Sequence, residues 1–363
     1  MTKGQLVLET GEVFSGEWIG YRGECVGEVV FNTSMTGYQE MLTDPSYAGQ
    51  IITLTYPIIG TYGINQEDSE SNHLQVAGVI MNDLCEEPNH FQSQATVTEI
   101  LKKHRISGLK NVDTRSLVVA IRKHGTIKGK LVLEKPFPDY KHEFILSDAK
   151  KLVQQVAVTS MVQTGAGSCH IVIVDFGYKK SMVHFLVNEG CKVTIVPYHY
   201  DIETIKALNP DGILISNGPG NPSELQIYFP KIRAVAESFP TLGICLGHQL
   251  IALAYGAKTE KLPFGHRGAN HPVKDLQTGK INITAQNHGY VVNRESVNES
   301  VFQLTFQHVH DNSVEGMKHK QLPITTVQFH PEAHPGPRDT TYILTDFVQQ
   351  VKQLKEEYLW EKV

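Results

Sequence analysis

A cysteine between two glycines is the first feature of this sequence that could do chemistry. Cys245 lies in the stretch Gly243-Ile-Cys-Leu-Gly247, after a short apolar run and before a helix-like segment. A nucleophile at a sharp turn from strand to helix needs glycines two positions before and after it, because a Cβ there would clash across the turn. The dipole and N–H groups at the start of the helix favour a thiolate. We therefore interpret Cys245 as a nucleophile; the alternative is a small buried cysteine at the end of a core strand.

A histidine and a glutamate two residues apart follow near the C-terminus, as His330-Pro-Glu332. Residues two apart on an extended chain face the same way, about 6.6 Å apart at Cα, so this imidazole and carboxylate can form a hydrogen bond. Pro331 cannot donate to a sheet and suits the last residue of a strand. Cysteine, histidine and an orienting acid are the groups of acyl transfer. A surface pair and a metal site that adds His334 are the alternatives.

A glycine-rich loop follows another apolar run. The stretch Ser216-Asn-Gly-Pro-Gly-Asn-Pro222 contains Gly218 and Gly220. At such glycines the backbone can approach a ligand closely, and its N–H groups can receive a developing oxyanion. The loop is no phosphate loop, because it lacks the ending Gly-Lys-Ser/Thr. Taken alone, it would be an ordinary turn.

The segments that position these motifs predict an α/β domain with a doubly wound, mainly parallel sheet, since strands and helices alternate at βαβ spacing. Binding sites in such sheets lie just past the carboxyl ends of the strands. The predicted strands are Ile171–Val174, Lys192–Val196, Gly212–Ser216 and Thr241–Ile244. The predicted helices are Ser181–Asn188, Asp201–Leu208, Ile227–Ser238, Gln249–Tyr255 and a core-facing terminal helix, Thr340–Tyr358.

The first part of the chain contains short strand-like runs bounded by turn residues, which predict a β-rich α+β domain. We assign residues 1–145 to this N-terminal domain, with Pro136 and Pro138 near its end, 146–168 to a connecting segment and 169–357 to the α/β domain. The strands expected here are Gln5–Leu8, Val13–Gly16, Cys25–Phe31 and Ile51–Thr55. The expected helices are Thr98–His104 and Ser116–Lys123, followed by Asp148–Val156 in the connecting segment.

The composition of the 363 residues excludes several classes of function. Lys and Arg total 33 against 38 Asp and Glu, and a net charge of −5 argues against binding to nucleic acid. The five cysteines are odd in number and widely spread, which is typical of a reducing compartment, so we expect a cytoplasmic protein. The longest charge-poor stretches are interrupted by glycine, proline or polar residues, and we expect no membrane segment.

Taken together, the three motifs resemble the class I (triad) glutamine amidotransferases. The resemblance narrows to the small-subunit family of carbamoyl phosphate synthetases on three further stretches, Phe264–Val273, Gln286–Tyr290 and His330–Pro337. The N-terminal half, which other class I amidotransferases lack, resembles the same family at Phe31–Glu40, Thr43–Tyr47, Leu54–Pro57 and Val112–Arg115.

The resemblance implies hydrolysis of glutamine, with Cys245 as nucleophile, His330 as base and Glu332 as the partner of the base. It implies that backbone N–H groups of Gly220 and Leu246 form the oxyanion hole. Tyr290 stands where phenylalanine is common in the family, and the triad itself matches the family pattern. The residues implied to hold glutamine are Ser46, Gly218, Gly220, Leu246, Gln249, Asn287, Gly289 and Tyr290.

The chain contains no recognisable ATP site, since a Walker loop and a carboxylate cluster for Mg²⁺ are missing. We therefore expect no cofactor in this chain, with ATP and Mg²⁺ on a partner. The resemblance implies that ammonia passes through a tunnel to a large ATP-grasp subunit, which makes carbamoyl phosphate from bicarbonate and ATP in a heterodimer or larger assembly. The N-terminal half would dock this partner and supply Ser46.

Other classes of protein remain as alternatives. A peptidase with the same cysteine, histidine and acid would turn over peptides and not glutamine, and a non-catalytic interaction module would not need the intact triad. Among the amidotransferases, the anthranilate and guanylate enzymes are disfavoured by the N-terminal half.

Overall fold

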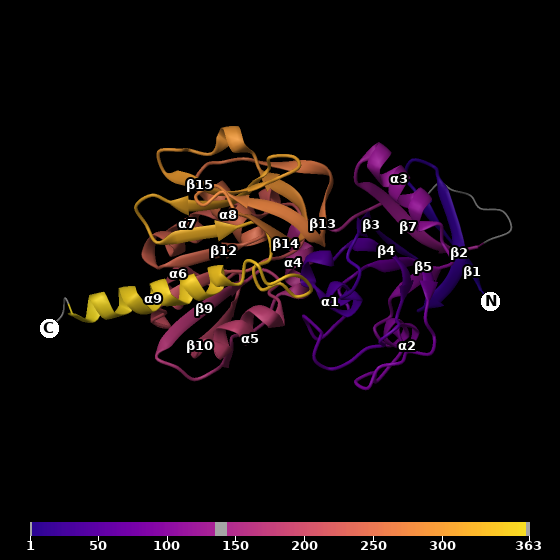
Figure 1. Cartoon of the computed structure of the whole chain (residues 1–363), viewed down its shortest axis with the longest axis horizontal. Coiled ribbons are helices and arrows are strands. Elements are labelled where there is room, and N and C mark those ends of the chain that lie inside the picture. The colour runs from indigo at the N-terminus through magenta and orange to yellow at the C-terminus, as the bar shows by residue number, and fades with distance from the viewer. Residues whose placement is uncertain (1, 135–143, 361–363) are drawn as a thin grey trace. The chain divides into compact units, whose positions relative to one another are not determined.

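The computed structural model describes residues 2–134 and 144–360, in two compact units (Figure 1). One unit comprises Met1–Ser147 with Leu262–Gly268, and the other comprises Asp148–Lys261 with Ala269–Val363. The domain end predicted near Pro136 and Pro138 lies outside the described residues. The limits predicted for the domains at residues 145, 168 and 357 stay predictions.

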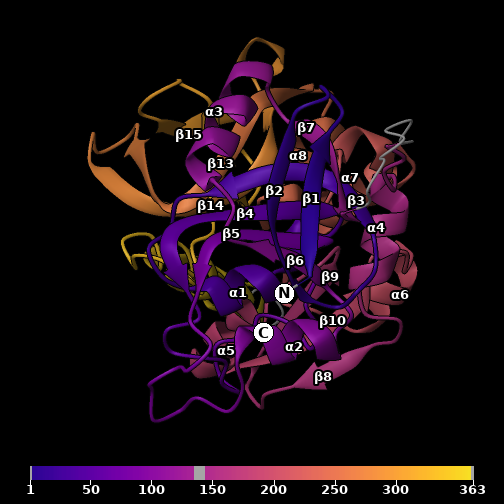
Figure 2. The same ribbon diagram turned by 90° about the vertical axis from the view of Figure 1, so that its right-hand side faces the viewer.

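The first unit is built around a closed barrel, whose strands follow the order β1-β2-β6-β5-β4-β3-β7 (Figure 2). The strands β3, β4, β5 and β6 pair in parallel, and the remaining neighbours are antiparallel. The expectation of a β-rich N-terminal part is therefore confirmed. The strands are β1 (Lys3–Leu8), β2 (Val13–Gly20), β3 (Cys25–Asn32), β4 (Gln50–Ile59), β5 (Gly78–Leu84), β6 (Ser107–Lys110) and β7 (Ile127–Leu133).

The barrel strands carry apolar side chains on both faces, and a helix contributes to the buried cluster on each face. On β4, Ile51 belongs to a buried cluster with Leu117 of α3, whereas its neighbour Ile52 belongs to another with Leu101 of α2. Successive strand residues point to opposite faces, so one strand supports both cores. Both helices were predicted. The helical segments are α1 (Tyr38–Thr43), the 3₁₀ helix η1 (Pro45–Tyr47), α2 (Val97–Lys103) and α3 (Thr114–His124).

The second unit contains a ten-stranded sheet in the order β14-β13-β15-β16-β17-β12-β11-β9-β10-β8. Its centre, from β10 to β17, is parallel, but both sides continue with antiparallel strands, so the sheet is mixed and not mainly parallel. Residues 262–268 in the middle of β13 belong to the first unit. The strands are β8 (Val162–Thr164), β9 (Cys169–Asp175), β10 (Cys191–Pro197), β11 (Gly212–Ile215), β12 (Thr241–Ile244), β13 (Thr259–Asp275), β14 (Ile281–Val292), β15 (Phe302–His308), β16 (Val314–His319) and β17 (Ile324–Val327).

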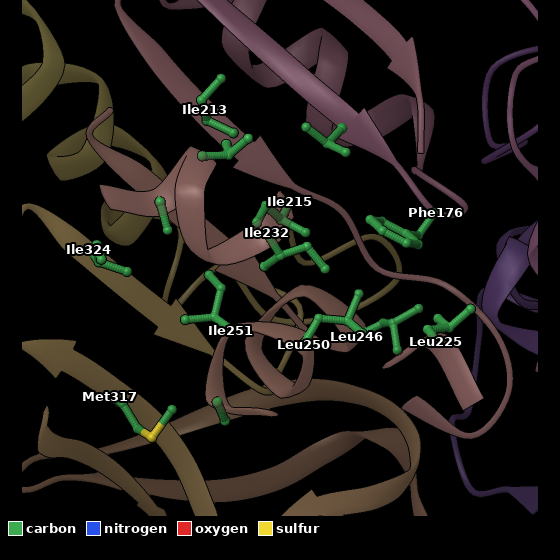
Figure 3. Close-up of a cluster of buried hydrophobic side chains, with 14 of the residues drawn as sticks. Phe176, Ile213, Ile215, Leu225, Ile232, Leu246, Leu250, Ile251, Met317 and Ile324 are labelled. Carbon is green, nitrogen blue, oxygen red and sulfur yellow. The ribbon is translucent and has the colours of Figure 1, made fainter. Parts of the chain in front are cut away.

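Helices lie on both faces of this sheet, as the doubly wound pattern predicted. On β9, Val172 faces a buried cluster formed with α4, α6, α7 and α8, and Ile173 faces the cluster formed with α5 and α9. Figure 3 shows Leu246 and Leu250 of α8 in the first of these clusters. The helical segments are α4 (Ala149–Val156), α5 (Lys180–Asn188), α6 (Ile202–Ala207), η2 (Pro222–Tyr228), α7 (Phe229–Ser238), α8 (Leu246–Ala254), η3 (Arg294–Ser296) and α9 (Tyr342–Trp360).

The predicted helix starts differ from the observed ones by one to three residues, and α8 and α7 are examples. Helix α8 begins at Leu246 and not at Gln249, so Leu246, Gly247 and His248 belong to its first turn. Helix α7 begins at Phe229 and not at Ile227, because Pro230 occupies the first helical turn, where its missing N–H costs no hydrogen bond, and a 3₁₀ segment precedes it.

Helix α9 allows a test of the buried cluster that it forms with α5 and β9. Leu344 is fully buried in the cluster shared with α5, and we expect Leu344→Ala to lower the free energy of unfolding by about 2–5 kcal/mol, because it leaves a cavity. Denaturant unfolding followed by circular dichroism measures this change. The matched control is Gln349→Ala on the exposed side of the same helix; equal effects of the two substitutions would contradict the packing of α9.

Candidate active site

Cys245 occupies the turn between β12 and α8 with a left-handed backbone, at φ 53° and ψ −103°. This conformation costs a non-glycine residue about 1–3 kcal/mol and persists only where the surroundings enforce it. A Cβ on Gly247 would lie 2.1 Å from the carbonyl oxygen of Ile215, and a Cβ on Gly243 would lie 2.9 Å from that of Gly247. The predicted reason for the two glycines is therefore confirmed.

The parallel pairing of β12 with β17 brings His330 to the same edge of the sheet as Cys245. Ile244 pairs with Val327, and the backbone N–H of Cys245 donates to the carbonyl of Val327 at 2.8 Å. His330 lies beyond the end of β17 in a single antiparallel bridge with Ala285 of β14. The prediction that Pro331 ends a strand is wrong, since β17 ends at Val327 and Pro331 lies in a turn.

The turn nevertheless produces the predicted contact. His330 Nδ1 lies 2.7 Å from Glu332 Oε1, and both side chains are buried. Nδ1 carries the proton of this hydrogen bond because a carboxylate only accepts. The other ring nitrogen, Nε2, is thereby left for the sulfur of Cys245. The sulfur is one of the groups that raise the pKa of His330.

A buried lysine, which the sequence analysis missed, completes a line of alternating charges. Lys179 Nζ donates to Glu332 Oε1 at 2.9 Å and also to the carbonyl of His334. Lys179 is held by the loop after β9, where Asp175 Oδ1 accepts from the N–H groups of Gly177 and Tyr178 at 2.7 Å each. Burial raises the pKa of Asp175 although these N–H groups counteract the effect.

The buried charges shift each other's pKa values strongly. Burial disfavours the charged form of His330, but the Glu332 carboxylate and the Cys245 sulfur outweigh it and raise the pKa of His330 to about 10. Burial likewise disfavours the Glu332 carboxylate, but Lys179 and His330 hold the pKa of Glu332 well below its usual range. The resting pair at neutral pH is therefore imidazolium and carboxylate.

This line of charges bears on the catalytic and metal alternatives for His330, Glu332 and His334. The ammonium group of Lys179 lies at hydrogen-bond distance from the carboxylate oxygen that a metal ion would need, and it would repel a cation there. Of His334, the backbone carbonyl and not the ring contacts Lys179. The geometry thus suits a histidine oriented by an acid.

The glycine-rich loop after β11 borders the turn of Cys245. A Cβ on Gly218 would lie 2.3 Å from the carbonyl oxygen of Phe176 and 2.8 Å from the side chain of Leu246. Gly220 has a φ of +93° and packs against Ala149 of α4. The backbone in this loop can adopt its path only because side chains are missing at both positions.

The predicted substrate residues on α8 and β14 also come together. Cys245 Sγ lies 3.7 Å from the carbonyl oxygen of Asn287, and Gln249 Nε2 donates to the carbonyl of Tyr290 at 2.7 Å. Gly289 lies between these two carbonyl groups on β14. The strand therefore places a backbone acceptor, the carbonyl of Asn287, beside the sulfur and another, that of Tyr290, beside Gln249.

A second residue that the sequence analysis missed, Gln328, touches the sulfur directly. Its Nε2 lies 3.6 Å from Cys245 Sγ, and its Oε1 accepts from Gln249 Nε2 at 2.9 Å. The spacing could have indicated it, because Gln328 precedes His330 by two residues, and side chains two apart on an extended chain face the same way. Lys179 gave a weaker signal, as a lysine four residues after the end of β9.

Ser46 is the one predicted site residue in the first unit. It lies buried in η1, where its backbone N–H donates to Asp44 Oδ1 at 2.9 Å and its carbonyl accepts from Gln50 Nε2. Its contribution to a glutamine site stays a prediction.

Comparisons with known proteins match both halves of the chain. Residues 172–350 match the family Glutamine amidotransferase class-I, and residues 6–131 match Carbamoyl-phosphate synthase small chain, CPSase domain. The carbamoyl phosphate synthase arginine-specific small chain of Bacillus subtilis is 48% identical over 98% of this chain and 99% of its own length. The chain belongs to the carbamoyl phosphate synthase small-chain family.

A second small chain agrees with this membership. The carbamoyl phosphate synthase small chain of Clostridium perfringens is 46% identical over 96% of this chain and 99% of its own length. A solved structure of a glutamine amidotransferase from Thermotoga maritima aligns with 52% of this chain and 85% of its own, at 16% identity and a TM-score of 0.36. The strand order described above, and not this alignment, establishes the fold.

Membership in this family fixes the general function. The chain is the glutamine-hydrolysing small subunit of a carbamoyl phosphate synthase, and a small chain implies a large-chain partner. None of the helices within residues 2–134 and 144–360 is long and apolar enough to cross a membrane.

The buried charges predict how stability depends on pH. The pKa of His330, about 10, lies above its ordinary value of 6.5, so the stabilisation is complete below pH 6.5 and disappears as the pH rises toward 10. The pKa of Glu332 lies below its ordinary value of 4.5, so its stabilisation is present above pH 4.5 and disappears in acid. In Glu332→Gln the carboxylate no longer opposes the effect of burial on His330, and the Cys245 sulfur alone still favours the charged imidazole.

We therefore expect the unfolding free energy of the wild type to exceed that of Glu332→Gln most between about pH 4.5 and 6.5. The difference should shrink by more than about 1 kcal/mol between pH 6.5 and 9.5. Denaturant titrations at each pH measure it, with Glu299→Gln at an exposed position as the control. A difference that grows with pH would show that His330 is neutral in the resting site.

Proposed function

We propose that Cys245, His330 and Glu332 form the catalytic triad that releases ammonia from glutamine through a γ-glutamyl thioester. The observation that carries this proposal is the convergence of the three side chains at the ends of β12 and β17, with the 2.7 Å contact between His330 and Glu332. The family to which the chain belongs supports it, since its members include a class I amidotransferase half.

In the first half of the reaction, the Cys245 thiolate attacks the side-chain amide carbon of glutamine and forms a carbon–sulfur bond. The negative charge moves to the amide oxygen, which the N–H groups of Gly220 and Leu246 would stabilise. The positive φ of Gly220 and the place of Leu246 as the first residue of α8 support this assignment. The carbon–nitrogen bond then breaks, and His330 gives its proton to the leaving ammonia.

In the second half, His330 has become neutral and can accept a proton from water. The hydroxide equivalent attacks the thioester carbon, the carbon–sulfur bond breaks, and glutamate leaves with the Cys245 thiolate restored. The proton taken from water remains on His330, so the site returns to imidazolium and thiolate. The Glu332 carboxylate stabilises the imidazolium in both halves, and Lys179 keeps Glu332 ionised.

The hydrogen bonds of Gln249 indicate which end of glutamine it would hold. Both hydrogens of its side-chain amide are used within the protein, by the carbonyl of Tyr290 and by Gln328 Oε1. Only Oε1 is then left for a ligand, and an oxygen acceptor suits the α-ammonium group of glutamine and not its carboxylate. The carbonyl groups of Asn287 and Tyr290 nearby are acceptors of the same kind.

Ammonia from this site would be used by the large chain. We expect that partner to be an ATP-grasp subunit that holds ATP and Mg²⁺ and joins ammonia to bicarbonate, in a heterodimer or a larger assembly, with the N-terminal half as docking surface. The relatives named above as small chains of carbamoyl phosphate synthase support a separate large chain. A cytoplasmic location stays an expectation, supported by five free thiols.

Replacement of Cys245 tests the mechanism. We expect Cys245→Ala to lower glutamine hydrolysis at least about a thousandfold, because no other group can form the thioester. Measured in the complex with the large chain, synthesis from ammonia should be unchanged, because the ammonia-forming step is bypassed.

The matched control is Cys85→Ala, a half-buried cysteine of the first unit, which should leave both activities unchanged. Mass spectrometry of the denaturant-quenched wild type should detect a γ-glutamyl adduct on the peptide that contains Cys245. Retention of glutamine-dependent synthesis by Cys245→Ala would refute the mechanism.

A further inference from the structure

A chain of buried amide groups connects β14 to the sulfur of Cys245. The carbonyl of Tyr290 accepts from Gln249 Nε2 at 2.7 Å, the same Nε2 donates to Gln328 Oε1 at 2.9 Å, and Gln328 Nε2 lies 3.6 Å from Cys245 Sγ. Gln249 and Gln328 are 3% and 0% exposed, so water does not compete for these contacts.

The direction of this chain is fixed at its Tyr290 end. A backbone carbonyl only accepts hydrogen bonds, so Gln249 must present its NH₂ group there. The second hydrogen of that NH₂ group then points to Gln328, whose side-chain oxygen must accept it. Gln328 consequently turns its own NH₂ group toward Cys245, and the sulfur faces a donor that cannot rotate into an acceptor without breaking a buried hydrogen bond.

The other neighbours of the sulfur have different preferences. The carbonyl of Asn287, 3.7 Å away, accepts a hydrogen bond from the protonated thiol and repels the thiolate. His330 is the titratable group beside the sulfur, and it is paired with Glu332 and, through Glu332, with Lys179. Gln328 is thus an uncharged donor that favours the ionised sulfur and leaves this charge pattern unchanged.

We propose that Gln328 is a positioning residue, which stabilises the thiolate of Cys245 through its side-chain N–H. This inference rests on the proposed role of Cys245 as the nucleophile. It adds to the site a residue outside the triad and outside the residues implied to hold glutamine, and it links the sulfur to Gln249.

Two substitutions of Gln328 separate its two hydrogen bonds. Gln328→Glu keeps an oxygen that accepts from Gln249 but replaces the donor beside the sulfur with a second acceptor. Gln328→Met keeps the length of the side chain and removes both bonds. If the donor to sulfur matters, the glutamate variant should be the more impaired of the two, although it retains the contact with Gln249.

The rate of alkylation of Cys245 by iodoacetamide from pH 5 to 10, followed by mass spectrometry of its peptide, reports the thiolate directly. We expect the rate at pH 7 to fall by up to about fivefold in Gln328→Met and more in Gln328→Glu, with the rising part of the profile displaced to higher pH in both variants. The kcat for glutamine hydrolysis should fall in parallel. The exposed Gln303→Glu is the matched control and should follow the wild type.

The shape of the pH profile does not depend on how much of a variant is folded, so a merely structural role of Gln328 would lower the yield of enzyme and leave the profile unchanged. A profile in both Gln328 variants that coincides with the wild type would overturn this inference alone. Normal glutamine hydrolysis by Cys245→Ala would instead overturn the proposed function.

Discussion

The parallel pairing of β12 with β17 is the constraint on which the rest of the site depends. Ile244 and Val327 are partners in the register, and the N–H of Cys245 continues the ladder by donating to Val327. Because both strands run in the same direction, the residues that follow them leave the sheet at one edge. A register shift by one residue would turn the residues of one strand to the opposite faces and separate Cys245 from His330.

Burial makes the charges of this site mutually dependent. His330, Glu332 and Lys179 have side chains no more than 3% exposed, and a buried ion without a partner costs several kcal/mol. Each group is tolerated because its neighbour has the opposite sign. Loss of one charge therefore changes the protonation of the next, which is why His330 stays protonated at neutral pH in spite of its burial.

The local parts of this site could be predicted from sequence, and the parts formed by distant residues could not. Gly243 and Gly247 are needed because the backbone around each leaves no room for a Cβ, so their spacing indicated the turn at Cys245. The contact of His330 with Glu332 was predicted correctly, but from an extended chain, whereas the chain turns there and Ala333 has a φ of 58°. Lys179 lies 153 residues from Glu332, and no periodic pattern connects the two.

The fold shows the same division. Apolar runs and helical spacing predicted the central strands β9 to β12 and the helices α5 to α9. In these elements, a short stretch of sequence already contains the apolar pattern that is buried. The antiparallel strands β13 to β16 were missed. In β13, glycine, histidine, asparagine and proline stand among few apolar positions, and the pairing of β15 with β16 is interrupted by register shifts. Their burial depends on partners supplied by the whole sheet.

Neutral amides hold the orientation of a site whose charges perform the chemistry. A buried lysine in place of Gln328 would compete with His330 for the sulfur and would itself need a counter-charge, whereas an amide can donate to sulfur and accept from Gln249 at the same time. Gln286 does the same on the other side of β14, where its NH₂ group donates to Glu315 Oε2 at 2.9 Å and its oxygen faces the ring of His288. An amide that both donates and accepts can be satisfied while fully buried. It can therefore fix the direction of a hydrogen bond to the nucleophile without changing the net charge around it.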